Sequence, residues 1–152
     1  MYTRGNFVAG SRGLWYVCGM EQIVSDSGWR GSPEVWLEAA FEALLESGID
    51  AVKIQPMFIT IDPARDTRDV LSEYLKSFDS RILGLTGTQA QIDHVVKEYR
   101  IYVAQQKAGT DDRDYLVSHS GFLYLMSPTG KFVSVIQGSE DGEAIASWLR
   151  KE

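Results

Sequence analysis

The sequence predicts an α/β fold in which a central mixed sheet carries helices on both faces. The main observation is the apolar, β-branched run Met57–Ile61, which has no helical period and is typical of a strand buried on both faces. The second is the polar loop Asp62–Thr67 behind it, because Pro63 lacks an N–H and cannot continue a ladder. The third is the alternation of helical and extended segments around this strand. Open α/β sheets place functional groups at the carboxyl ends of such strands.

One helix is predicted before the central strand. Pro33 occupies the favoured first-turn position, with Ser32 as the N-cap, and Ser47-Gly48 ends the helix. Apolar side chains recur at helical spacing over a broad face, which suits a helix packed on a sheet. These residues are Trp36, Leu37, Ala39, Ala40, Phe41, Ala43, Leu44 and Leu45.

Two further helices and a short strand are predicted after the central strand. Asp66 or Thr67 can cap the first helix, a strand covers residues 82–85, and the second helix follows Thr86-Gly87-Thr88. The first helix is amphipathic, with apolar residues at Val70, Leu71, Tyr74, Leu75 and Phe78. The inward-facing residues of the second are Ile92, Val95, Val96 and Tyr99. Residues 101–104 predict a short extended piece, and the polar residues 105–114 predict a surface loop.

The C-terminal part predicts a hairpin and a final helix. Strands are expected at residues 121–126 and 131–136, joined by a turn at Ser127-Pro128-Thr129-Gly130. A helix over residues 142–150 then buries Ile145, Trp148 and Leu149. A strand–strand–helix ending is typical of a thioredoxin-like fold.

The chain divides into two parts by pattern. Residues 32–152 are expected to form the domain, and residues 1–31 form a poorly patterned N-terminal segment. One strand is expected at Leu14–Cys18, although glycines interrupt the region. Two explanations stay open: the segment adds an extra strand, or a frameshift or mis-called start has replaced the native opening.

Composition excludes several classes of function. A formal net charge of −6 with scattered basic residues argues against a nucleic-acid-binding surface. The single cysteine, Cys18, excludes an internal disulfide or a CxxC pair, so no enzymatic thiol–disulfide activity is expected. No run has the length of a membrane helix, and the start lacks the apolar core of a signal peptide. We expect one domain that is monomeric and carries no anchor in this chain.

Three blocks, in this order, resemble the Sco/SenC family of copper chaperones. They are VKIQPMFITIDPARDT at residues 52–67, RILGLTGT at residues 81–88 and DYLVSHSGFLYLMSP at residues 114–128. The resemblance implies a thioredoxin-like fold and a role in assembling the copper site of cytochrome c oxidase. It also implies tethering in the bacterial periplasm or at the mitochondrial inner membrane. The implied partners are the copper subunit of cytochrome c oxidase or other copper chaperones.

The resemblance implies a copper site made by two cysteines of one loop and a distant histidine. In this chain His119 matches the family histidine and is the metal ligand that the resemblance assigns. Gly28 and Ser32 stand where the two cysteines are expected, and Ser118 stands where the family usually has aspartate. Copper(I) prefers thiolate and thioether ligands, and a serine hydroxyl is a hard, weak donor. The expected copper site is therefore degraded or remodelled.

Alternative roles for the remaining candidates stay open. Cys18 and Met20 could replace the missing soft ligands, but a lone cysteine is more commonly a small buried hydrophobe. Cys18 could also serve a peroxiredoxin-like thiol peroxidase, and the whole chain could be an interaction module that binds no metal. His94 is expected at a solvated helix position.

We expect structural rather than catalytic roles for the charged residues of two loops. Asp62, Arg65 and Asp66 are expected to cap a helix and form an ion pair. Asp111, Asp112 and Asp114 are expected in a solvated loop, because their spacing lacks the glycine and the terminal glutamate of an EF-hand.

Overall fold

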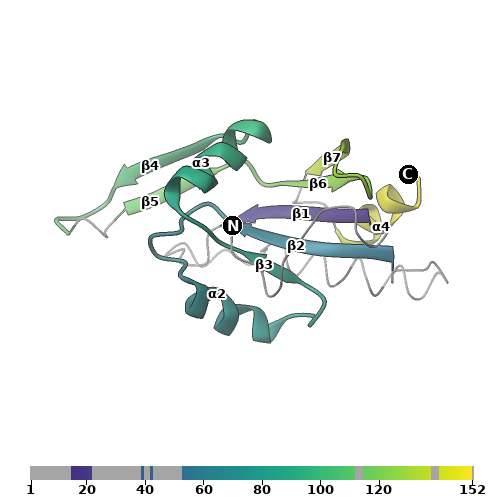
Figure 1. Cartoon of the computed structure of the whole chain (residues 1–152), viewed down its shortest axis with the longest axis horizontal. Helices are drawn as coiled ribbons and strands as arrows, with labels where there is room; N and C mark the ends of the chain where they lie inside the picture. The colour runs from purple at the N-terminus through teal and green to yellow at the C-terminus, as the bar shows by residue number, and fades with distance from the viewer. Residues whose placement is uncertain are drawn as a thin grey trace.

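The computed structural model describes residues 15–21, 39, 42, 53–111, 115–137 and 141–151. In chain order, its elements are β1 (Trp15–Glu21), β2 (Ile54–Thr60), α2 (Arg68–Tyr74), the 3-10 turn η2 (Leu75–Ser77), β3 (Leu83–Leu85), α3 (Gln89–Glu98), β4 (Val103–Lys107), β5 (Tyr115–His119), β6 (Phe122–Met126), β7 (Phe132–Gln137) and α4 (Gly142–Arg150) (Figure 1). This order confirms the predicted α/β class.

The main sheet is mixed, as predicted, with the strand order β3-β2-β1-β6-β7. β1, β2 and β3 run parallel, whereas β6 is antiparallel to both β1 and β7. The run Met57–Ile61 is buried throughout, because apolar clusters pack on both faces of β2 and a strand pairs with each of its edges. The middle strand of the sheet is β1, however, and it comes from the segment with the weakest pattern. Cys18 and Gly19 are both buried there, and small residues let the chain be covered on both faces.

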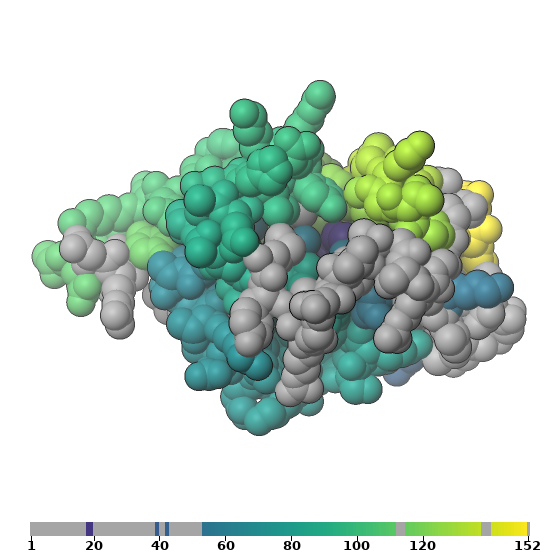
Figure 2. Space-filling view, in the orientation of Figure 1, coloured from purple at the N-terminus to yellow at the C-terminus, as the bar shows by residue number. Residues whose placement is uncertain are grey.

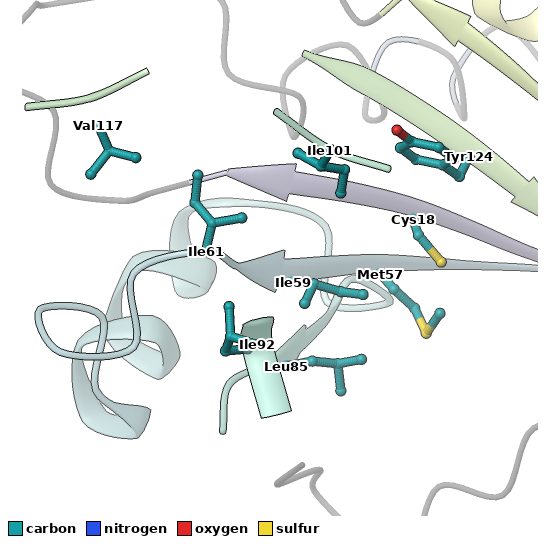
Figure 3. Close-up of a cluster of buried hydrophobic side chains, with 9 residues drawn as sticks. All are labelled: Cys18, Met57, Ile59, Ile61, Leu85, Ile92, Ile101, Val117 and Tyr124. Atoms are coloured by element: carbon teal, nitrogen blue, oxygen red, sulfur yellow. The ribbon is translucent and has the colours of Figure 1, made fainter. Parts of the chain in front are cut away.

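Two clusters of apolar side chains cover opposite faces of the sheet. Met57 and Ile59 point to one face of β2 and pack with Ile92 of α3, whereas Phe58 points to the other face and packs with Leu71 of α2. Figure 3 shows the first cluster, which Cys18, Ile61, Leu85, Ile101, Val117 and Tyr124 complete. Helices therefore lie on both faces of the sheet, as predicted.

A second, two-stranded sheet is formed by β4 and β5. They pair antiparallel from Val103↔His119 to Lys107↔Tyr115. The predicted surface loop at residues 105–114 is therefore wrong at residues 105–107, which belong to β4. Their polar side chains are exposed and carry no apolar alternation, but a backbone ladder does not require apolar side chains. Figure 2 shows this hairpin, in green, projecting from the rest of the molecule.

The C-terminal hairpin and helix follow the prediction closely. In the turn between β6 and β7, Ser127 N–H donates to Lys131 O at 2.8 Å, and Gly130 has the positive φ of 77° that glycine adopts easily. A bulge shifts the register at Leu125/Met126. Asp141 caps α4, and the Trp148 indole N–H donates to the Ser134 hydroxyl of β7 at 2.9 Å. The predicted burial of Ile145 is complete.

Some predictions fall outside the described residues. Of the helix predicted after Pro33, only Ala39 and Glu42 are described, and both are helical. The boundary between residues 31 and 32 is also outside them, so the division of the chain stays a prediction. Among the described segments, no helix combines the length and apolar character that crossing a bilayer requires.

Candidate functional site at the β4–β5 hairpin

His119 is the last residue of β5 and is half-buried. No strand was predicted between residues 114 and 121, and the structure adds one there because the backbone of His119 pairs with Val103 of β4. The imidazole Nδ1 lies 3.3 Å from the carbonyl oxygen of Ser120. A carbonyl oxygen only accepts hydrogen bonds, so as a hydrogen bond this contact places a proton on Nδ1, and the neutral imidazole then has its lone pair on Nε2. In this tautomer Nε2 is the atom able to bind a metal ion.

The loop after β2 holds the start of β5 through a buried ion pair. Arg65 Nε donates to Asp62 Oδ2 at 2.6 Å, and the two side chains are only 15% and 1% exposed. The Tyr115 hydroxyl donates to the other carboxylate oxygen, Oδ1, at 2.8 Å. Arg65 also donates to the Tyr115 carbonyl at 3.0 Å, and its guanidinium carbon lies 4.0 Å from the Tyr115 ring centroid. Burial and the neighbouring carboxylate raise the pKa of Tyr115, so its hydroxyl stays protonated as the donor.

A second set of buried hydrogen bonds holds the same loop against the ends of β2 and β3. The Thr60 hydroxyl donates to Asp66 Oδ2 at 2.6 Å and accepts from the Asp62 N–H at 3.0 Å. Thr86 donates to the Asp66 carbonyl at 3.2 Å. Thr67, rather than Asp66, is the N-cap of α2. The predicted ion pair of Arg65 is confirmed, as is the alternative of Thr67 as the cap. The cap expected from Asp66 is wrong, because its carboxylate accepts from the Thr60 hydroxyl instead.

Cys18 has the properties of a core residue. It lies in the middle of β1 with 0% exposure, among Met57, Ile59 and Tyr124 (Figure 3). Burial raises the pKa of its thiol to about 12, although a hydrogen bond with Tyr99 acts in the opposite direction. A peroxidatic or copper-binding thiol must form the thiolate and be reachable. The peroxiredoxin-like alternative and the replacement-ligand alternative for Cys18 therefore find no support, and the buried-hydrophobe interpretation is confirmed.

The other candidates do not converge on His119. His94 is exposed on α3, as predicted, and Asp111 is exposed before β5. Gly28 and Ser32 lie outside the described residues, as does the Met20 side chain. Within the described part of the chain, no group of three His, Cys, Asp or Glu residues could hold a metal ion.

The donor set does not fit a complete copper(I) site. His119 supplies one imidazole, an acceptable partner for copper(I), but the soft thiolates that give such sites their affinity are absent from its neighbourhood in the described residues. Gly28 has no side chain to offer, and a hydroxyl such as that of Ser32 is a hard donor. Among the described residues, the site therefore offers an imidazole, and no cluster of further ligands joins it.

Sequence reasoning missed Tyr115 as part of the site. Tyr115 and Asp62 are 53 residues apart, so no local pattern links them. One signal was available: Tyr115 and His119 are four residues apart in an extended run, which puts their side chains on the same face.

Comparison with known proteins gives a consistent result. The sequence pattern of the SCO1/SenC family matches residues 35–152. The mitochondrial protein SCO2 of Saccharomyces cerevisiae is 44% identical over 103 residues, which are 68% of this chain and 34% of the yeast protein. The human mitochondrial SCO1 homologue is 39% identical over 95 residues, covering 62% of this chain and 31% of the relative. The chain thus spans about a third of the length of these curated relatives.

Solved structures agree with the sequence relatives. The crystal structure of Arabidopsis thaliana ScoI with copper bound has a TM-score of 0.78 and 31% identity, covering 91% of this chain and 83% of that one. The crystal structure of yeast Sco1 has a TM-score of 0.77 and 34% identity, with the same two coverages. These matches also confirm the thioredoxin-like fold. The chain belongs to the SCO1/SenC family.

Proposed function

We propose that this chain serves in copper delivery and cytochrome c oxidase assembly as a member of its family with a reduced ligand set. The observation that carries the proposal is His119, half-buried at the end of β5, with its Nδ1 at 3.3 Å from the Ser120 carbonyl oxygen. Copper would be the cargo of such a protein and not a resident cofactor. The copper-bound ScoI of Arabidopsis thaliana, which shares the fold at 31% identity, supports copper as the metal.

The residues at the two expected cysteine positions determine how the chain would act. With Gly28 and Ser32 in place of two thiolates, one imidazole is the remaining ligand and copper(I) binding is weak. The chain would therefore act mainly through contact with a partner, either the copper subunit of cytochrome c oxidase or another copper chaperone. It would do so in the periplasm or at the inner membrane, and without enzymatic chemistry of its own.

A competitive copper(I) titration under reducing conditions tests this proposal. The samples are the natural chain and the variant Gly28→Cys/Ser32→Cys, each with and without His119→Ala. We expect the natural chain to lose the competition against a chromophoric chelator. The double-cysteine variant should bind tightly, and His119→Ala should weaken that binding.

Two outcomes would contradict the proposal. Tight binding by the natural chain that disappears in His119→Ala would reveal a remodelled site with other soft ligands. Absence of binding by the double-cysteine variant, with its fold intact by circular dichroism, would show that Gly28 and Ser32 do not occupy the positions of the family's cysteines.

A further inference from the structure

We infer that Tyr115 is a positioning residue for His119, and that Asp62 and Arg65 of the loop after β2 act through it. The importance of the imidazole as a ligand rests on the proposed function, whereas its placement can be measured without any metal.

Tyr115 and His119 lie on the same face of β5. Side chains alternate along a strand, so Tyr115, Val117 and His119 share one face. Val117 is 8% exposed and belongs to the apolar core, against which Tyr115 also packs. Leu116, on the opposite face, is 46% exposed. A shift or rotation of β5 at Tyr115 therefore moves His119 relative to the body of the molecule.

Tyr115 is held by contacts of its hydroxyl, its ring and its carbonyl oxygen. Its hydroxyl is bound by Asp62, its ring lies under Arg65, and its carbonyl accepts from Arg65. The Asp62–Arg65 ion pair closes this arrangement, so side chain and backbone of one residue are fixed together. Charge-assisted hydrogen bonds in such a buried setting are stronger than neutral ones.

In the described structure, no strand of the main sheet pairs with β5. β5 has a ladder only with β4, and a two-stranded hairpin is marginally stable by itself. Figure 1 shows this hairpin lying apart from the main sheet, near the loop between β2 and α2. The orientation of the hairpin thus depends on its short junction with β6, on the packing of Ile101, Val103 and Val117 in the core, and, at the Tyr115 end, on the contacts of Tyr115.

Nuclear magnetic resonance of the natural chain tests the inference, because the chain has only two histidines. His94 lies exposed on α3 and serves as the internal reference. Tyr115→Phe removes one hydroxyl and keeps the ring under Arg65, and Asp62→Asn removes the carboxylate charge. We expect both variants to shift the His119 imidazole resonances and to speed amide exchange in β5 about tenfold, with His94 unchanged. Glu73→Gln, which breaks the exposed Lys76–Glu73 pair, is the matched control and should change neither histidine.

The inference is overturned if the variants lower the melting temperature but leave the His119 resonances and β5 exchange as in the natural chain. In that case the contacts only stabilise the fold. Tyr115→Phe keeps the Asp62–Arg65 ion pair, so it carries the test if Asp62→Asn does not fold.

A copper(I) titration adds a functional readout and separates this inference from the proposed function. In the Gly28→Cys/Ser32→Cys background, Tyr115→Phe should weaken copper(I) binding by about tenfold, as changes in the groups that orient a ligand do. The same substitution should have no effect once His119→Ala is present. Equal losses with and without His119 would contradict the inference. Absence of copper binding in the double-cysteine background would contradict the proposed function only, because the resonance measurement needs no metal.

Discussion

Arg65 lies over the ring of Tyr115 at 4.0 Å while its Nε is bound to Asp62, so one guanidinium joins a loop to a strand that begins 50 residues later. The cation is only 15% exposed, and the carboxylate beside it is 1% exposed. Because both side chains are largely removed from solvent, each charge stabilises the other.

Removing the carboxylate should therefore be costly. We expect Asp62→Ala to lower the free energy of unfolding by about 3 kcal/mol, because it leaves the Arg65 charge buried and the Tyr115 hydroxyl without its acceptor. Urea denaturation measures the change. Glu73→Ala breaks an ion pair whose side chains are 67% and 75% exposed, and it should cost less than about 1 kcal/mol. Equal losses in the two variants would show that the buried pair has no special weight.

The Thr60 hydroxyl is expected to support the same loop from the core. Thr60→Val keeps the shape of the side chain but leaves Asp66 Oδ2 and the Asp62 N–H without this partner. Burial of both groups predicts a loss of about 2 kcal/mol in the free energy of unfolding. Thr129→Val removes an exposed hydroxyl in the β6–β7 turn and should change stability by less than about 0.5 kcal/mol. Wild-type stability of Thr60→Val would contradict the role assigned to this hydroxyl.

Cys18 predicts a pH dependence of stability. Burial raises the pKa of its thiol from 9.0 to about 12, so the folded state favours the protonated form. Below about pH 9 the thiol is protonated in both the folded and the unfolded state, so it adds no pH dependence. Between about pH 9 and about pH 12 the unfolded thiol ionises while the folded one keeps its proton, so the free energy of unfolding decreases as the pH rises through this window. Comparing unfolding of the natural chain with Cys18→Ala between pH 8 and about 11 isolates this contribution. A pH-independent difference between the two would contradict it.

The same burial predicts low reactivity of the Cys18 thiol. A disulfide reagent should modify Cys18 only as fast as the protein opens, and rapidly in denaturant, because the reactive species is an accessible thiolate. Modification at the rate of a free thiol under native conditions would be incompatible with its place in β1.

Gly84 is expected to be required by close packing between β3 and α2. A Cβ at this position would lie 2.5 Å from Leu75 Cδ1 and 2.9 Å from Leu71 Cγ. Gly84→Ala should therefore lower the free energy of unfolding by about 1–3 kcal/mol through overpacking. Gly121→Ala is the matched control, since a Cβ there has nothing within 4 Å, and it should leave stability nearly unchanged. Thermal unfolding followed by circular dichroism compares the two.

Much of the fold could be predicted because periodicity and capping act locally. The buried run of β2, the helices α2, α3 and α4, and the β6–β7 hairpin all follow from apolar spacing and from turn residues such as Gly130. The central position of β1 could not be predicted, because Gly19 weakens its pattern and its partners are distant in the chain. β4 was predicted only at residues 103 and 104, and β5 was not predicted, because the exposed, polar residues of β4 form strand structure only through their ladder with β5.

The candidate site was predictable only in part. His119 is identifiable from the resemblance carried by its neighbours, and the ion pair of Arg65 from the composition of its loop. The link from Asp62 to Tyr115 arises from tertiary packing across 53 residues, and no spacing in the sequence expresses it. The absence of thiolates at residues 28 and 32 is visible in the sequence alone.

The middle position of β1 has a consequence for the order of folding. β1 joins a parallel half, β2 and β3, to an antiparallel half, β6 and β7, and the two halves share no ladder without it. Its contact with β6 pairs Cys18 with Tyr124, near opposite ends of the chain. Such distant pairing slows folding, since a long loop must close before the contact stabilises anything. During synthesis, β1 leaves the ribosome before β6 and must wait for it, so its apolar residues depend on the parallel half, or on a chaperone, until residues 122–126 emerge.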